Sequence, residues 1–240
     1  YHDLPLSAIS RGVAPTRAWK QKSFDKAWLI GDTVNASIGQ GYVLASPLQL
    51  AIMAARLGTG RAVLPKLVQS IDETAMPLGT GAPLDVDPEH LKVVQRAMFA
   101  VTNTKKGTAY SKRIASPDLQ MAGKTGTAQV RRITAEERLT GVIRNEDLPW
   151  EKRDHALFVD YAPYDNPKVA VAVVVEHGGG GSSTAAPIAR DITLFALTGE
   201  MPAPSHYPAG LQAQIREEQE ELAPKLFDWS TLDKKGQVQT

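Results

Sequence analysis

Gly123-Lys124-Thr125-Gly126-Thr127-Ala128-Gln129 is the stretch that decides how this 240-residue chain folds. It continues an alternating segment that starts at Leu119, so the sequence predicts one extended strand over residues 119–130. Gly126 removes a side chain where another backbone must approach closely. The lysine provides one positive charge and the two threonines provide hydroxyl donors. The pattern therefore predicts a strand that holds an anion.

A strand at the border of a sheet has unpaired N–H and C=O groups, so an extended peptide can bind alongside it. We expect the hydroxyls of Thr125 and Thr127 to donate to a terminal carboxylate. Lys124 attracts the anion, and the backbone N–H of Thr127 is a candidate for half of an oxyanion hole; one such donor is worth roughly 3 kcal/mol of barrier. Lys124 is thus the predicted catalytic residue, and Thr125, Gly126 and Thr127 are the predicted substrate-binding residues.

This motif has two other interpretations. A phosphate-binding loop requires a glycine five positions before Gly123, where this chain has Asp118, and a helix directly after the Lys-Thr pair. Here Gly126 interrupts and the strand pattern continues, which argues against a nucleotide site. The remaining alternative is an exposed Lys-Thr turn without function.

Composition limits the classes of function. A net charge of +1 argues against nucleic acid as a partner, because such proteins concentrate basic residues on one face. The absence of cysteine excludes disulfides and thiolate metal sites. No two of the five histidines have H-x-x-x-H spacing, so we predict no zinc site and no cofactor. The longest apolar run, Val169 to Val175, is far shorter than the ~20 residues of a membrane span.

Helix signals occur in three places. Ser46, Pro47 and Gln49 form a capping box before an apolar stripe that Gly58 ends. A second helix starts at Asp87-Pro88-Glu89, with a buried stripe of Leu91, Val94, Ala97, Met98 and Val101. A third carries Ile188, Ile192 and Phe195 on one face and has Gly199 beyond its end.

Two further strands are predicted, His155 to Tyr161 and Val169 to Glu176. Turn residues at 162–167 favour an antiparallel hairpin, and the valine run of the second strand predicts burial on both faces. Residues 1–35 are expected to be an irregular loop with solvated Arg17, Lys20, Lys22 and Lys26. Residues 131–154 are expected to be an exposed or partly disordered excursion.

The change in composition predicts a boundary at residue 198. Residues 1–198 are expected to belong to the domain that carries the lysine strand, and residues 199–240 are expected to be a tail that is partly helical or disordered. Tyr1 is not a natural start, so a targeting segment is expected upstream.

Taken together, six segments resemble the downstream half of class B penicillin-binding transpeptidases, and within them the elongation-specific group of Gram-negative bacteria, penicillin-binding protein 2. The resemblance runs from about residue 11 to residue 198. It rests on Pro15–Lys20, Gly31–Thr33, Ile38–Tyr42, Ser46–Ala51, Ala122–Val130 and Tyr161–Pro167.

This resemblance implies an α+β fold, an antiparallel five-stranded sheet with helices on both faces, of which this chain is the C-terminal portion. It also implies a serine enzyme that cross-links peptidoglycan stem peptides and is acylated by β-lactams. By family analogy the whole protein has an inner-membrane anchor, a periplasmic catalytic domain and a membrane glycan polymerase as partner. Only Lys124, Thr125, Gly126 and Thr127 carry over as site residues.

The nucleophile is expected upstream of Tyr1. Ser23-Phe24-Asp25-Lys26 matches the S-x-x-K signature by spelling but lies in a basic loop without apolar periodicity. Thr33-Val34-Asn35 only imitates the S-x-N signature. We therefore expect this chain alone to be inactive. The alternatives left open are a carboxypeptidase or β-lactamase of the same fold and a non-catalytic sensor of peptidoglycan or penicillin.

Overall fold

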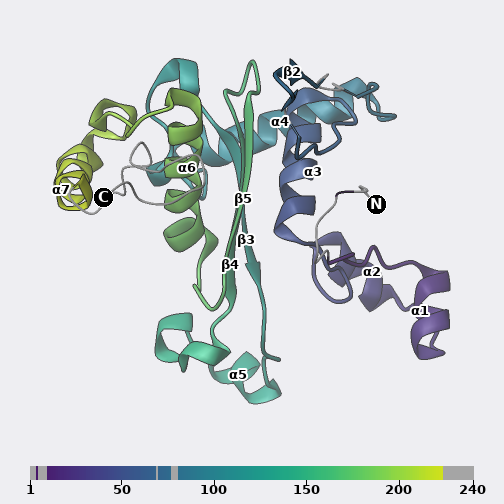
Figure 1. Cartoon of the computed structure of the whole chain (residues 1–240). Coiled ribbons are helices and arrows are strands. Elements are labelled where there is room, and N and C mark those ends of the chain that lie inside the picture. The colour runs from purple at the N-terminus through teal and green to yellow at the C-terminus, as the bar shows by residue number, and fades with distance from the viewer. Residues whose placement is uncertain (1–3, 5–9, 69, 77–80, 224–240) are drawn as a thin grey trace, which may run out of the picture.

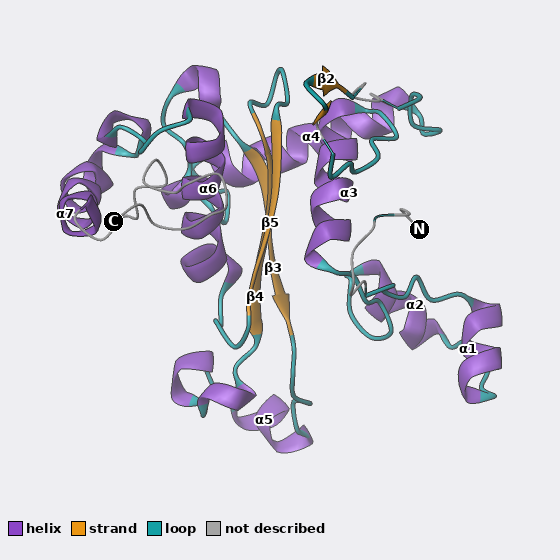
Figure 2. Cartoon of the chain, viewed as in Figure 1, coloured by secondary structure: helices purple, strands orange, loops and turns teal. Residues whose placement is uncertain are grey.

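The centre of the molecule is a three-stranded antiparallel sheet with the order β3-β4-β5 (Figure 2). The computed structural model describes residues 4, 10–68, 70–76 and 81–223. Strand β3 spans Ala122–Ala128, β4 spans His155–Ala162 and β5 spans Val169–Val175. Helix α3 (Pro47–Thr59) covers one face and α6 (Ala186–Thr198) covers the other (Figure 1). This arrangement confirms the α+β class with helices on both faces.

The hairpin prediction is confirmed by the strand register. Strand β4 pairs with β3 from Ala122↔Tyr161 to Ala128↔His155, and with β5 from Ala162↔Val169 to Ala156↔Val175. The prediction that β5 is buried on both faces is wrong, because Val171 is its one buried residue and the others are half-buried. Strand β5 is paired on one side only within the described ranges, so it lies at a sheet border.

Helix α3 begins as predicted, with reciprocal hydrogen bonds between Ser46 and Gln49. The predicted end at Gly58 is wrong, because the helix continues to Thr59 and Gly60 caps it with a φ of 67°. Gly58 lies inside the helix, where an added Cβ would come within 2.7 Å of the Tyr161 ring. It is glycine because helix and sheet approach each other closely there.

Helix α4 (Pro88–Asn103) starts at the predicted Asp87 cap, which accepts a hydrogen bond from Glu89 N. The predicted apolar stripe is only partly buried. Met98 is buried, but Val94 and Ala97 are exposed. Buried Thr102, one turn after Met98 on the same side of the helix, donates to the carbonyl of Met121 at 2.7 Å and holds this side against the residue before β3.

Helix α6 and its Gly199 cap are confirmed. Ile188, Ile192 and Phe195 share one side of α6 but are 41–56% exposed. The buried residues of α6 are Ala186, Ala189, Arg190, Thr193 and Leu194. The two alanines and the leucine belong to the core cluster that includes Ala156 and Phe158 of β4.

Residues 10–35 are not the predicted irregular loop. They form α1 (Arg17–Phe24), capped by Thr16, and most of α2 (Ile30–Ser37). Lys20, predicted to be solvated, is 4% exposed and forms an ion pair with Asp32 at 2.5 Å. A short helix brings the lysine back over α2, which sequence spacing did not show.

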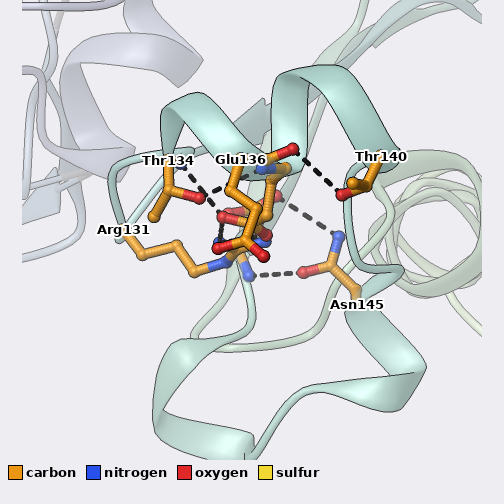
Figure 3. A network of polar contacts seen from close by, with 7 residues as sticks. Arg131, Thr134, Glu136, Thr140 and Asn145 are labelled. Atoms are coloured by element: carbon orange, nitrogen blue, oxygen red, sulfur yellow. Dashed lines mark hydrogen bonds and ion pairs between the residues drawn. The ribbon is translucent and has the colours of Figure 1, made fainter.

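Residues 131–154 connect the end of β3 to the start of β4 and contain helix α5 (Ala135–Thr140) (Figure 1). Thr134 and Glu137 form a capping box, and Arg131 pairs with Glu137 at 2.8 Å (Figure 3). The Thr134 N–H bond and the Arg131 pair lower the pKa of the Glu137 carboxyl. Asn145 and Asp154 hold the returning chain through two hydrogen bonds. The segment is therefore a folded unit rather than a loose loop.

The segment after Gly199 packs back on the molecule. Tyr207 is 2% exposed beneath the Arg190 guanidinium, which lies 4.5 Å from the ring centre. The predicted short helix is α7 (Gln212–Leu222). The domain boundary at residue 198 stays a prediction, and residues 224–240 lie outside the described part.

Two features are absent from the described residues. None of their helices is long and apolar enough to cross a membrane. Nor do three or more acidic or histidine side chains of these residues gather in a group able to hold a metal ion.

Candidate active-site strand

The outer border of β3 is open in the part of the chain that the structure describes, since β4 pairs with its other side. The carbonyl of Thr125 accepts from Lys124 Nζ at 2.5 Å, and the carbonyl of Thr127 accepts from Gln40 Nε2 at 2.9 Å. These carbonyls are two residues apart and point to the same side of the strand. In an antiparallel strand the N–H of each residue faces the same way as its C=O. The backbone groups of Thr125 and Thr127 therefore face outward.

The four predicted site residues lie together on the accessible half of β3. Lys124 and Thr127 are exposed, whereas Thr125 and Gly126 are half-buried. The first part of the strand, Ala122 and Gly123, is buried in the core. One strand thus combines a fixed buried end with an accessible polar end.

The two glycines of the motif differ in their surroundings. A Cβ at Gly123 would lie 2.5 Å from the Phe158 ring and 2.9 Å from the carbonyl of Val159, so packing requires glycine there. A Cβ at Gly126 would approach only Leu157, at 3.2 Å from its Cβ. Packing in the core therefore restricts the residue at position 126 less than the residue at position 123. The accessible side of Gly126 leaves room for a second backbone.

Three polar residues that the sequence analysis did not assign lie at this border. Thr108 Oγ1 is 3.1 Å from Thr125 Oγ1, and Ser182 Oγ donates to the Thr108 carbonyl at 2.5 Å. Gln40 holds the Thr127 carbonyl from the loop before α3. Gln40 belongs to a recognised segment, Ile38–Tyr42. Thr108 lies in the turn after α4 and Ser182 in a single π-helical turn, Gly181–Ala185, and no motif assigned either residue to the site.

The hydroxyl pair determines what Thr125 can do. A threonine hydroxyl has one proton, so Thr125 donates to a ligand only if it accepts from Thr108. Because Ser182 fixes the Thr108 backbone, Thr108 is well placed to donate to Thr125. With Thr108 as the donor, the single proton of the Thr125 hydroxyl is left to donate to an anion at the border.

Ser23 and Lys26 do not form a nucleophile pair. Ser23 lies in the last turn of α1, and Asp25 ends that helix in the left-handed region with a φ of 51°. Lys26 lies beyond this break and is exposed. The pair therefore lacks the single helical face on which a lysine takes the proton of a serine one turn away.

The fold and this border strand define a class: the acyl-transfer domains that react with penicillin, whose third signature is a Lys-Thr-Gly strand. Residues 12–194 match the model of the penicillin binding protein transpeptidase domain, and the chain belongs to this family.

Its relatives include curated proteins and solved structures. The chain is 37% identical over 216 residues to the peptidoglycan D,D-transpeptidase MrdA of Haemophilus influenzae, covering 87% of this chain and 32% of that protein. It is 36% identical over 187 residues to MrdA of Escherichia coli K12, covering 75% and 29%. The chain thus spans about a third of the length of these relatives.

Two solved structures share the fold. Pseudomonas aeruginosa PBP2 in complex with WCK 5153 has a TM-score of 0.64 at 35% identity, covering 85% of this chain and 43% of that one. Helicobacter pylori PBP2 in complex with MreC has a TM-score of 0.62 at 32% identity, covering 79% and 32%.

Proposed function

We propose that this chain is the substrate-gripping portion of a peptidoglycan D,D-transpeptidase that acts during cell elongation. The observation that carries the proposal is the open border of β3, where Lys124 and the outward groups of Thr125 and Thr127 lie together. The names of the relatives, which are peptidoglycan D,D-transpeptidases, supply the substrate class.

The roles follow from the geometry of the strand. A stem peptide that ends in D-Ala-D-Ala lies antiparallel to β3 and bonds to the outward backbone groups. Its terminal carboxylate accepts from the Thr125 and Thr127 hydroxyls and is attracted by Lys124. The N–H of Thr127 then donates to the oxygen that becomes negative in the transition state. Lys124 is the proposed catalytic residue of this chain.

The reaction needs a serine from the part of the whole protein upstream of Tyr1. Its oxygen attacks the carbonyl carbon of the penultimate D-alanine, and its proton passes through a base to the departing D-alanine. The resulting ester is then attacked by the amine of a second stem peptide, which releases the serine. A β-lactam imitates the D-alanyl dipeptide and acylates the same serine.

The same proposal covers the location and the partner of the whole protein. Its catalytic domain lies in the periplasm, it has a single membrane anchor, and its partner is a glycan polymerase. The support is the family itself and the solved complex of a related PBP2 with MreC.

Labelling with a fluorescent penicillin tests the proposal. The whole protein is expected to become covalently labelled at a serine outside residues 1–240, while the isolated chain stays unlabelled. A label mapped to Ser23 would overturn the assignment of the nucleophile. Rapid release of the label would instead identify a β-lactamase.

A further inference from the structure

A pocket lies beside helix α2 and the loop that leads from it to α3. Its volume is about 290 Å³, and its lining includes Pro15, Trp28, Asp32, Asn35, Gly41 and Tyr42. None of these residues has a role in the reaction described above. The pocket combines two aromatic rings with a carboxylate and an amide.

The aromatic walls are held rigidly. Tyr42 contacts Trp19 and Phe24, with ring centres 5.4 and 5.1 Å apart. The indole N–H of Trp28 donates to Thr33 Oγ1 at 2.8 Å, which fixes the orientation of that ring. Rigid aromatic surfaces bind a ligand face at low cost in conformational entropy.

The charges under the pocket cancel each other. Lys20 Nζ donates to Asp32 Oδ2 at 2.5 Å and lies 5.7 Å from the centre of the Tyr42 ring. Asp32 Oδ2 also accepts from Leu29 N at 2.7 Å. The Lys20 bond and the Leu29 bond lower the pKa of the Asp32 carboxyl, which favours the carboxylate form. A paired cation and anion favour an uncharged ligand over a free carboxylate or a free amine.

Polar groups of the pocket remain available to a ligand. Within the described ranges, neither the Asn35 side-chain amide nor the Tyr42 hydroxyl makes a hydrogen bond, and Asp32 Oδ1 has none either. Flat aromatic faces beside free amide and hydroxyl groups suit a sugar ring, because a sugar offers C–H groups on its face and hydroxyls at its edge.

The loop that carries Tyr42 also reaches the proposed active-site strand. Gln40, two residues earlier, donates to the carbonyl of Thr127 at 2.9 Å. We infer that this pocket binds an N-acetylated amino sugar of the glycan strand whose stem peptide lies along β3. This inference rests on the proposed function and adds a saccharide site to it.

The test uses the whole protein and two substrates that share one stem peptide ending in D-Ala-D-Ala, with and without the attached N-acetylated amino sugar. The specificity constant of acylation by each is measured by competition with a fluorescent penicillin. The wild type is expected to prefer the sugar-bearing substrate. Asn35→Ala and Trp28→Ala are each expected to reduce this preference about 5- to 10-fold, as the loss of one or two contacts does. Asn166→Ala, in an exposed turn, is the matched control and retains the preference.

The preference is the ratio of the two specificity constants, so a loss of active protein lowers both constants equally and leaves the preference unchanged. If Trp28→Ala does not fold, Tyr42→Phe keeps the ring, removes the hydroxyl and is expected to reduce the preference about 3-fold. An equal preference for both substrates in the wild type would overturn the inference. So would an equal loss with both substrates in Asn35→Ala, which would indicate a peptide subsite.

A binding experiment separates this inference from the proposed function. Saturation-transfer NMR with a free disaccharide of N-acetylated amino sugars requires no acylation. Binding that Asn35→Ala removes supports the saccharide site even if penicillin never labels the protein. No saturation transfer in the wild type, together with normal penicillin labelling, would overturn the site and leave the transpeptidase proposal standing.

Discussion

Strands β3 and β4 lie side by side in one sheet, yet they place a charged residue in opposite surroundings. Strand β4 is buried over its last five residues and carries Asp160 at 0% exposure. Strand β3 carries the exposed Lys124 one residue from Gly123, which pairs with Asp160. The difference follows from pairing: β4 is paired on both sides and buried, whereas the border of β3 that faces away from β4 stays open in the described residues and is where we propose the substrate binds.

The largest expected effect tests the open side. Lys124→Ala removes the charge at the border of β3, and acylation of the whole protein by penicillin is expected to slow about 10²- to 10³-fold. Stopped-flow labelling with a fluorescent penicillin measures this rate. Lys152→Ala, a similarly exposed lysine near the start of β4, is the matched control and retains the rate. Equal rates in Lys124→Ala and wild type would remove Lys124 from the mechanism.

The next effect tests the buried side. Burial raises the pKa of Asp160 to about 8, although Thr193 donates to it at 2.8 Å. The folded protein therefore binds a proton that the unfolded chain releases near pH 4, and stability falls as pH rises from about 4 to 8. The slope is about 1.4 kcal/mol per pH unit, or roughly 3 kcal/mol between pH 5 and 7.

Asp160→Asn keeps an acceptor for Thr193 and has no proton to lose. Thermal unfolding between pH 5 and 8 is expected to show a flatter stability profile in this variant and a higher melting temperature than wild type at pH 7. Parallel pH profiles for variant and wild type would show that Asp160 is ionised in the folded protein.

A third prediction separates the two ends of β3. Gly123→Ala forces a methyl group against the Phe158 ring and is expected to cost about 1–3 kcal/mol of stability. Gly126→Ala meets only Leu157 and is expected to cost less stability but to slow acylation, because the methyl group obstructs an approaching peptide. Melting temperature and labelling rate together distinguish the two, with Gly210→Ala, where the added atom meets nothing, as reference. Identical behaviour of both strand variants would contradict the division.

The smallest effect concerns the residues that support the border. Thr108→Val retains the shape of the side chain but cannot donate to Thr125, so acylation is expected to slow about 3- to 10-fold, the loss of one hydrogen bond. The loss should be absent for a substrate analogue that lacks the terminal carboxylate. Thr104→Val, in the same loop, is the control because its hydroxyl bonds only to Ala100 of its own helix. A uniform loss with both substrates would indicate a purely structural role for Thr108.

Most of the secondary structure was predictable because its signals are local. The Ser46–Gln49 capping box, the Asp87 start of α4 and the turn between β4 and β5 each depend on neighbouring residues. Helices α1 and α5 were missed although each has a local cap, Thr16 and the Thr134–Glu137 box. Other errors occurred where distant contacts decide: residue 58 is a glycine inside α3 because Tyr161 needs the space, and Lys20 is buried because it pairs with Asp32.

The sequence alone predicted strand β3 and the positions of Lys124, Thr125, Gly126 and Thr127 on it, because residues that follow one another on a strand keep their spacing in any fold that keeps the strand. Their role in binding and catalysis stays a proposal. Only the tertiary structure decided which polar side chains lie beside these residues and where the pocket at α2 lies. Thr108 contacts the Thr125 hydroxyl, Gln40 donates to the Thr127 carbonyl and Ser182 donates to the Thr108 carbonyl, all from segments far away in sequence. Helices α1 and α2 are joined by the ion pair between Lys20 and Asp32. Contacts of that kind depend on how separate elements pack, and no local pattern records them.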